Sequence, residues 1–484
     1  MEKLSGAMLP ELRERPIRVL QYGEGNFLRA FVDWMLDELN RKTGFNGAAA
    51  VVQPIPQGRA GALAAQDCLY TLYLQGLRGG KPLREHRVIS SIRTAIDPYQ
   101  DYDAYEALAR CETLRYIVSN TTEAGIAFHA GDRLTDRPPV GYPAKLAAFL
   151  YRRFQAFAGD PKKGCVILPC ELIDRNGDRL RKLMLRCASE WELPPAFTDW
   201  LENACTFCCT LVDRIVSGYP KDDIAAVTAE LGYEDALVDV GEQFHLWVIE
   251  GPEWIGRELP FAEAGLNVKF VGDVTPYRTR KVRILNGAHT ALTPVAYLAG
   301  LDTVGEAVAD PLVGKFVRGA LYEEILPTLP MPEAELAEFT AAVLERFGNP
   351  YVRHYLTSIA LNSVSKYKTR VLPTVTGALE KGGKPPRRLL FALSALFAFY
   401  RGQRGCSPIP LQDEAAVLEF FRGEWARCDG SETALRALAK AALAREDFWG
   451  RSLLALPGVY DAVADGLCLI ESRGMRAALE SVTA

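Results

Sequence analysis

Short apolar runs that alternate with helical segments restrict the fold of this chain more than any other feature. Four runs predict buried strands, at residues 17–22, 48–55, 116–119 and 165–168. Helical periodicity lies between them, for example at residues 102–110 and 143–157. Because parallel strands are joined by helical crossovers and are buried on both faces, this alternation predicts a parallel, doubly wound α/β sheet.

The second half of the chain has a different pattern. Long helical periodicities replace the strands at residues 280–298, 332–347, 355–364, 387–401 and 431–444. The segment 267–277 looks like the join between the two parts. We therefore expect an α/β domain over residues 1–274 and a mainly α-helical domain over residues 275–484. Two large domains fit the length as well as three of roughly 150 residues each.

Composition excludes several classes of protein. The formal net charge is −4, and lysines and arginines are scattered, so there is no electrostatic footprint for nucleic acid. The first residues lack the apolar core of a secretory signal. The longest apolar run, residues 389–400, is shorter than the ~20 residues that span a bilayer. These features predict a cytoplasmic protein with no membrane partner.

The cysteines do not form an obvious framework. There are 11 of them, an odd number dispersed over a long chain, which is not typical of disulfide scaffolds. Cys205, Cys208 and Cys209 form a C-x-x-C-C cluster, but no second Cys/His pair with zinc-site spacing follows. We interpret them as buried thiols and expect no metal.

A glycine turn follows the first predicted strand. Gly23 and Gly25 lie in the sequence GEGNFLRA, directly before a helical pattern. One glycine permits a tight turn, and the other lets a pyrophosphate approach the backbone at the helix N-terminus. Arg29, one turn into the helix, is expected to add a charge-assisted contact. The turn therefore predicts a dinucleotide site, and the alternative is a plain strand–helix turn.

Two elements of the usual dinucleotide fingerprint are missing. Leu28 stands where a third glycine is expected, and Gln53 and Pro54 stand where strand two usually ends in an acid. That acid normally binds the ribose 2′-hydroxyl of NAD. Without it, the sequence leaves the choice between NAD and NADP open.

A second group of polar residues lies at the join. Lys281, Asn286 and His289 open the helical pattern of the second domain. In a regular α-helix they fall within an arc of roughly 140°, with Lys281 and His289 ~12 Å apart along the axis. Helical side chains lean toward the N-terminus, so Asn286 and His289 lean toward Lys281.

These residue types suit the reduction of a ketone. Hydride delivery creates an alkoxide that needs a proton and hydrogen-bond donors. A desolvated lysine can give that proton near neutral pH, and an amide and an imidazole can hold the oxygen. The alternative interpretation is a solvated lysine, a helix-capping asparagine and a core histidine.

Taken together, the two motifs resemble the mannitol dehydrogenase family of long-chain polyol dehydrogenases. The motifs are G-x-G-N-F-x-R-A and K-x4-N-x2-H, and further similar segments lie at residues 119–123, 169–177, 211–216, 273–277 and 346–350. The resemblance covers most of the chain. Longer runs are similar to a branch of the family that acts on sugar acids: residues 21–34, 119–126, 169–174, 211–220 and 284–292.

The resemblance implies metal-independent hydride transfer between NAD(H) and a polyol or ketose, here a hexuronate or aldonate. It implies a Rossmann-type NAD-binding domain, a helical substrate-binding and catalytic domain, and an active site in the cleft between them. Lys281 would be the general acid/base, with Asn286 and His289 as substrate ligands. The residues implied near the cofactor are Gly23, Gly25, Asn26, Phe27 and Arg29 at the pyrophosphate, and Thr122 and Asp213 close by. An inactive dinucleotide-binding sensor is the alternative outside enzymes.

Two points of the implied site stay open. Mannitol dehydrogenases have a second oxyanion-binding asparagine where this chain has Leu172. The carboxylate of a sugar acid also needs a cation, ideally a bidentate arginine. The candidates are Lys366, Lys368 and Arg370, which otherwise form an exposed charged loop, and Arg214, which otherwise has a structural role. The sequence does not predict the oligomeric state.

Overall fold

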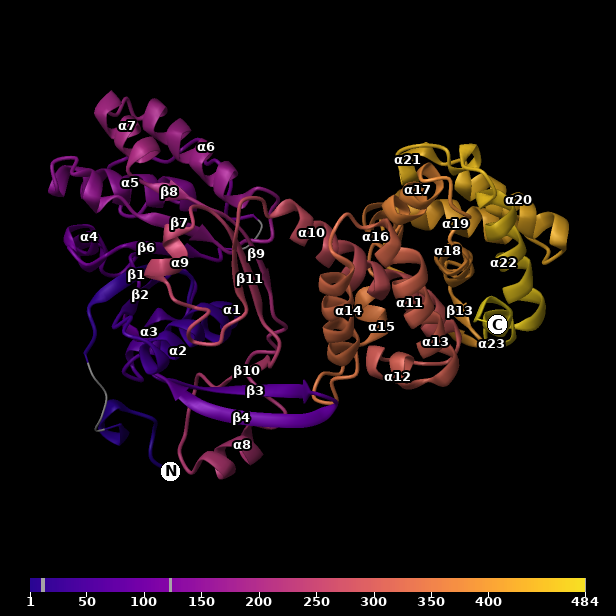
Figure 1. Ribbon diagram of the computed structural model, residues 1–484, viewed down its shortest axis with the longest axis horizontal. Helices are drawn as coiled ribbons and strands as arrows, with labels where there is room; N and C mark the ends of the chain where they lie inside the picture. Colours follow the sequence, from indigo (N-terminus) through magenta and orange to yellow (C-terminus); the bar gives the residue numbers. More distant parts are fainter. Residues whose placement is uncertain (10–13, 122–123, 484) are drawn as a thin grey trace. The chain divides into compact units, whose positions relative to one another are not determined.

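The computed structural model describes residues 1–9, 14–121 and 124–483, which form two compact units. The first unit comprises Met1–Gly76 and Leu83–Val274. The second comprises Thr275–Ala484 together with the short segment Leu77–Pro82. The ribbon diagram shows the elements of each unit (Figure 1).

A six-stranded parallel sheet forms the centre of the first unit, in the order β5-β2-β1-β6-β7-β8. Its strands are β1 (Ile17–Tyr22), β2 (Ala48–Val52), β5 (Ile92–Ile96), β6 (Tyr116–Ser119), β7 (Val166–Pro169) and β8 (Thr206–Phe207). The order reverses between β1 and β6, as in doubly wound nucleotide-binding domains. The predicted fold class is confirmed.

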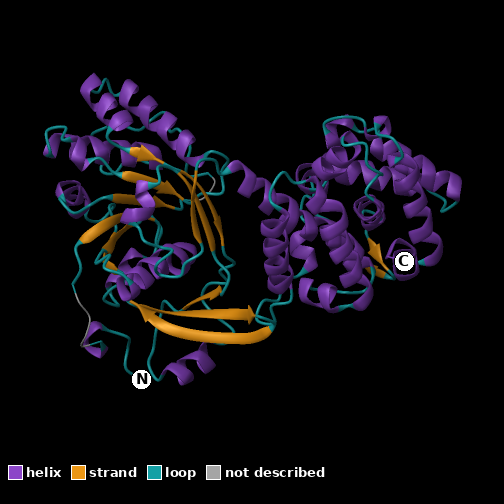
Figure 2. Ribbon diagram, in the orientation of Figure 1, coloured by secondary structure: helices purple, strands orange, loops and turns teal. Residues whose placement is uncertain are grey.

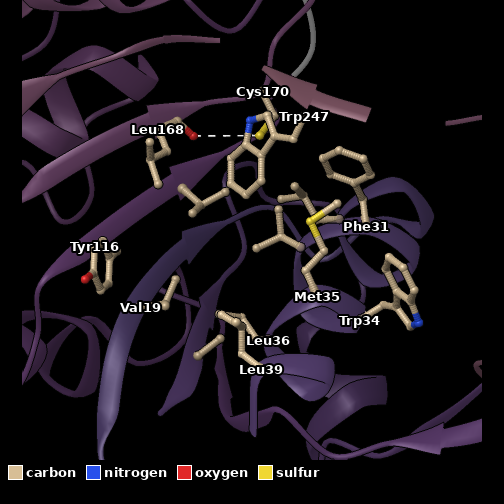
Figure 3. Packing of buried hydrophobic residues seen from close by; sticks show 14 of the residues in the cluster. Val19, Phe31, Trp34, Met35, Leu36, Leu39, Tyr116, Leu168, Cys170 and Trp247 are labelled. Carbon is tan, nitrogen blue, oxygen red and sulfur yellow. Dashed lines mark hydrogen bonds between the residues drawn. The ribbon is translucent and has the colours of Figure 1, made fainter. Parts of the chain in front are cut away.

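Both faces of this sheet are buried, each under its own hydrophobic cluster. Successive residues of a strand point to opposite faces and therefore belong to different clusters. Val19 belongs to one hydrophobic cluster, and Leu20 to the other. Figure 3 shows the first cluster, where the helical run after β1 packs on the sheet through Phe31, Met35, Leu36 and Leu39. The helices α4 to α7 supply the second cluster.

The helices of the first unit follow the predicted crossovers. They are α1 (Asn26–Leu28), α2 (Trp34–Lys42), α3 (Ala60–Ala64), α4 (Tyr102–Ala107), α5 (Tyr142–Ala156), α6 (Asn176–Glu190), α7 (Pro195–Asn203), α8 (Ile224–Leu231) and α9 (Trp254–Glu258). A π-helical turn, Arg29–Asp33, joins α1 to α2, so residues 26–42 form one helical run.

The first unit also holds two smaller sheets that the sequence analysis missed. One has the order β10-β3-β4, from β3 (Tyr70–Arg78), β4 (Lys81–Ile89) and β10 (Asp239–Glu242). The other has the order β12-β11-β9, from β9 (Cys209–Asp213), β11 (Leu246–Glu250) and β12 (Val268–Val271). The segment that looked like an interdomain join therefore begins with a strand.

The second unit is mainly helical, as predicted (Figure 2). Its elements are α10 (Thr275–Lys281), α11 (Gly287–Leu298), α12 (Val304–Ala309), α13 (Pro311–Gly319), α14 (Glu333–Phe347), α15 (Leu356–Ile359), α16 (Ser363–Arg370), α17 (Leu372–Glu380), α18 (Arg387–Phe399), α19 (Ala415–Arg427), α20 (Glu432–Leu443), α21 (Glu446–Trp449), α22 (Val459–Arg473) and α23 (Met475–Thr483), with the short strands β13 (Gln403–Arg404) and β14 (Ser407–Pro408). Helix α18, apolar on all sides, is the buried centre and packs against α11, α22 and α23.

Three predicted elements differ from the structure. Strand β2 ends at Val52, three residues before the predicted end. The helix predicted at 355–364 is two helices, because Asn362 adopts a left-handed backbone with φ 52° between α15 and α16. The helix predicted at 280–298 is divided by a π-helical turn. Within the described residues, no helix combines the length and apolarity needed to cross a bilayer.

Candidate functional site

The glycine turn after β1 has the geometry of a phosphate-binding turn. Gly23 has φ +125°, and a Cβ built there would lie 3.1 Å from Leu28 Cδ1 and 3.2 Å from the Asn120 carbonyl oxygen. Only glycine fits that position without strain. Gly25 caps the helical run, is exposed, and would have no neighbour within 4 Å of a Cβ. The backbone at the helix N-terminus is therefore open to a phosphate group.

The two residues that follow are half-buried and fixed by their neighbours. Asn26 accepts a hydrogen bond from Arg29 Nη2 at 2.6 Å, and its amide lies against Gly218, where a Cβ would be 2.2 Å from Asn26 Nδ2. Phe27 stacks on Phe31 with ring centroids 5.0 Å apart. Gly218 thus belongs to the surroundings of the turn, although it lies almost 200 residues away in the sequence.

Arg29 has buried partners that the sequence did not indicate. Its guanidinium is fully buried, donates to the Leu237 carbonyl at 2.5 Å and lies 3.7 Å from the Asp239 carboxylate. It also lies over the Tyr70 ring, 4.9 Å from the centroid. Arg29 joins the helical run to the segment around β10, and its expected contact with a phosphate stays a prediction.

The buried carboxyl of Asp33 makes the stability of the fold depend on pH. It is fully buried, accepts from Gln21 Nε2 at 3.0 Å, and burial raises its pKa to about 7. The folded state thus binds a proton more tightly than the unfolded state, whose pKa is about 3.9. The ionised carboxyl therefore destabilises the fold increasingly as pH rises from about 4 to about 7.

Asp33→Asn is expected to raise the free energy of unfolding at pH 8, by roughly 2–4 kcal/mol, and by much less at pH 5. Urea unfolding at the two pH values measures the difference. Asp222→Asn, which changes an exposed carboxyl, is the control and should show little effect at either pH. Equal effects of Asp33→Asn at both pH values would contradict the prediction.

The loops after β6 and β7 are held together by Glu171. This carboxylate is buried and accepts from Ser119 Oγ at 3.1 Å and from the amide and hydroxyl of Thr121 at 3.0 Å each. Burial raises its pKa. Thr122, expected near the cofactor, lies outside the described residues. Because these loops follow neighbouring parallel strands, they lie at the same edge of the sheet as Gly23.

Two further positions of the expected site, Asp213 and Leu172, lie in the first unit. Asp213 is buried at the end of β9, opposite Leu246 of β11. Leu172 follows β7 and is 59% exposed. Its apolar side chain provides no hydrogen-bond donor at the position where the resemblance implies a second oxyanion-binding asparagine.

Arg214 is a buried cation whose hydrogen bonds go to main-chain carbonyls. It donates to Ala30, Gln243 and Phe244, and lies over the Trp34 ring at 4.1 Å. Burial lowers its pKa to about 9. These contacts favour the structural role that the sequence left open, rather than carboxylate binding.

In the second unit, a π-helical turn changes the relation between Lys281 and Asn286. Lys281 ends α10, the turn spans Val282–Asn286, and the Gly287 amide donates to the Val282 carbonyl, five residues earlier. In an α-helix, residues five apart differ by roughly 140° in direction. In a π turn they lie about one turn apart and so on nearly the same face. Lys281 and Asn286 are therefore better aligned than a regular helix would allow.

His289 is buried near the start of α11 with its ring between two aromatic neighbours. It stacks on Phe347 with centroids 4.2 Å apart, and the His354 ring meets it edge-on at 5.0 Å. Burial lowers the pKa of His354. Neither neighbour was predicted from the sequence, although Phe347 lies in the 346–350 segment that carried part of the resemblance.

The three basic residues of α16 are not an exposed loop and have different surroundings. Lys366 Nζ donates to the Ile359 carbonyl at 2.8 Å. Lys368 packs on Gly450, where a Cβ would be 3.2 Å from Lys368 Cε. Arg370 is half-buried, which lowers its pKa, and its carbonyl oxygen would lie 3.2 Å from a Cβ on Gly287. Helix α16 thus packs directly beside the π turn.

The cysteine cluster has no geometry of a metal site. Cys205, Cys208 and Cys209 are buried, and burial raises the pKa of the Cys208 thiol to about 12. All 11 cysteines are free thiols. In the described ranges, no group of three or more His, Cys, Asp or Glu side chains is arranged to hold a metal ion.

Comparison with known proteins decides the family. The Mannitol dehydrogenase Rossmann domain matches residues 17–262, and the Mannitol dehydrogenase C-terminal domain matches residues 273–468. The chain belongs to the mannitol dehydrogenase family. Two curated members are Altronate oxidoreductase of Bacillus subtilis, 52% identical over 99% of this chain and 98% of its own length, and Altronate oxidoreductase of Klebsiella pneumoniae, 50% identical over 96% of each.

Two solved structures of the family share the fold. One is Pseudomonas fluorescens mannitol 2-dehydrogenase, in ternary complex with NAD and D-mannitol, with a TM-score of 0.69. The other is D-sorbitol dehydrogenase in substrate-free form, with a TM-score of 0.78. Each is 23% identical to this chain and covers at least 99% of both chains. At this identity the likeness supports the fold.

Proposed function

We propose that this chain is an altronate oxidoreductase that uses NADH to reduce tagaturonate reversibly to altronate in the cytoplasmic breakdown of hexuronates. The observation that carries the proposal is identity of 50–52% to altronate oxidoreductases over nearly the whole chain. Lys281, Asn286 and His289, gathered on one helical segment, supply residue types that ketone reduction needs.

The first unit would hold the dinucleotide at the glycine turn. Gly23 forms the tight turn, and the open space above Gly25 lets a pyrophosphate reach the helix N-terminus. Asn26 and Phe27, fixed by Arg29 and Phe31, would line the same turn. When bound, NADH supplies the hydride.

The second unit would supply the proton and the hydrogen-bond donors for the substrate oxygen. Protonated Lys281 gives its proton to the oxygen of the carbonyl as that oxygen gains negative charge. Asn286 donates an amide N–H to the same oxygen, and the π turn keeps it on the face of Lys281. His289 binds the substrate oxygen or a neighbouring hydroxyl, with its ring plane fixed by Phe347. The reverse oxidation needs neutral Lys281 as base and is therefore favoured at higher pH.

Arg370 is the cation we favour for the substrate carboxylate. Its helix packs against the π turn, and its guanidinium can bind a carboxylate with two parallel hydrogen bonds. Lys366 already donates to a main-chain carbonyl, and Lys368 packs on Gly450. Both are weaker candidates for that reason.

A substrate panel tests the proposal. NADH oxidation is followed with tagaturonate, fructuronate and fructose, and tagaturonate is expected to give the highest kcat/KM, with fructose at least ~100-fold below it. Fructose has no carboxylate and leaves the half-buried cation unpaired, whereas fructuronate carries the same carboxylate and tests the stereochemistry of the site. Preference for fructuronate or fructose would instead assign a fructuronate reductase or a mannitol 2-dehydrogenase. Absence of turnover with any of them would favour an inactive dinucleotide-binding sensor.

A further inference from the structure

The loop after β2 lacks the acid that usually binds the adenosine ribose in this class of domain. Gln53 follows the strand, and its amide is already engaged. Gln53 Nε2 donates to the carbonyls of Ile55 and Pro56 at 3.0 and 3.1 Å, and Oε1 accepts from the Ala60 amide at 3.3 Å. Gln53 therefore shapes the loop and does not replace the missing acid.

A carboxylate reaches this loop from another part of the chain. Glu24, between the two glycines of the phosphate turn, accepts a hydrogen bond through Oε1 from the Arg59 amide at 3.1 Å. A Cβ built on Gly58 would lie 2.2 Å from that same oxygen. The Glu24 carboxylate and the Gln53 side chain, 2.4 Å from the same point, therefore fill the place of a side chain on residue 58, in the loop that follows β2.

The position of Glu24 links the two halves of a dinucleotide site. Its backbone belongs to the turn proposed to hold the pyrophosphate, and its carboxylate lies at the loop where a Rossmann-type domain meets the ribose. The side chain is only 7% exposed, and burial raises its pKa, while the Arg59 N–H bond opposes that change. The carboxylate is thus held in one place and does not move freely in solvent.

We propose that Glu24 is the specificity-determining acid of this enzyme, which accepts hydrogen bonds from the adenosine ribose hydroxyls and excludes a 2′-phosphate. The inference rests on the dinucleotide site of the proposed function. The negative charge of Glu24 selects NAD(H), because a nearly buried carboxylate repels the 2′-phosphate of NADP(H). Arg59 is the opposing group, since an exposed arginine at this loop can bind the phosphate of NADP.

Nucleotide binding tests this inference without the sugar acid. Quenching of tryptophan fluorescence gives the Kd of NADH and of NADPH for wild type, Glu24→Gln and the control Glu112→Gln, which changes an exposed carboxylate. Glutamine keeps the size and the acceptor for the Arg59 amide but removes the charge. We expect the preference for NADH to fall at least tenfold in Glu24→Gln and to remain unchanged in Glu112→Gln.

The outcomes separate this inference from the proposed function. A wild-type preference for NADH that Glu24→Gln retains in full overturns the role of Glu24 and leaves the proposed function standing. Wild-type protein that binds neither nucleotide overturns both. If the wild-type protein prefers NADPH, Arg59 rather than Glu24 determines which nucleotide binds at this loop, and the inference is overturned. Melting temperatures of the variants verify that each is folded.

Discussion

Turnover of tagaturonate by Lys281→Ala protein is expected to fall at least ~100-fold, because positioned general acids contribute about 10²–10⁴-fold. The alkoxide formed by hydride transfer has no other proton donor in the proposed arrangement. Asn286 and His289 stabilise the oxygen but remain in place, so some activity above the uncatalysed rate should persist. Stopped-flow measurement of NADH oxidation at saturating substrate gives the loss in kcat directly.

The control for this prediction is Lys315→Ala, which removes an exposed lysine of α13 in the same unit. It should leave kcat within about twofold, as is usual for surface positions. Fluorescence titration should show the same NADH affinity for both variants and wild type. Full activity of Lys281→Ala would remove this lysine from the mechanism, whichever substrate is preferred.

The parallel sheet and the glycine turn could be predicted because their signals are local. Residues 17–22 carry apolar side chains on both faces and are followed by Gly23, which is sufficient to predict a buried strand and a tight turn. The same holds for 116–119. The buried central helix α18 follows from an apolar run bounded by charges.

The missed β3–β4 hairpin also had a local signal. Gly79 and Gly80 join the two strands with φ +59° and +74°, the backbone of a two-residue hairpin turn. A Gly-Gly pair between strand-like segments is enough to predict such a turn. Strand β4 has four consecutive polar residues, Arg84 to Arg87, and is mostly exposed, so it lacks the continuous apolar run that marked the other strands.

Other parts of the candidate site depend on partners distant in sequence. Nothing in the sequence around Arg29 indicates that its carboxylate partner is Asp239, 210 positions later, because a basic residue beside a phosphate turn suggests a phosphate contact instead. The contact of Glu24 with the loop at Gly58 is similarly invisible until the chain is folded. The π turn before Asn286 has no sequence signature in helical periodicity, which assumes 3.6 residues per turn.

Arg29→Met is expected to lower the free energy of unfolding by about 3–5 kcal/mol, the usual cost of removing one partner of a buried ion pair. The substitution leaves the Asp239 carboxyl without its cation, and the Leu237 carbonyl without its donor. Burial raises the pKa of Asp239 to about 7 even with Arg29 present. The loss should therefore be greater at pH 8 than at pH 6, since the unpaired carboxyl is ionised at the higher value.

A double-mutant cycle separates the charge from the packing. Asp239→Asn in the Arg29→Met background should recover part of the lost stability, because an amide costs less than an unpaired carboxylate in the same buried place. Arg179→Met, an exposed substitution on α6, should change stability by no more than about 0.5 kcal/mol. If Arg29→Met instead keeps wild-type stability and weakens NADH binding, the arginine contacts the pyrophosphate after all. The residue would then leave its buried partners when the nucleotide binds, and the turn would be a moving part of the site.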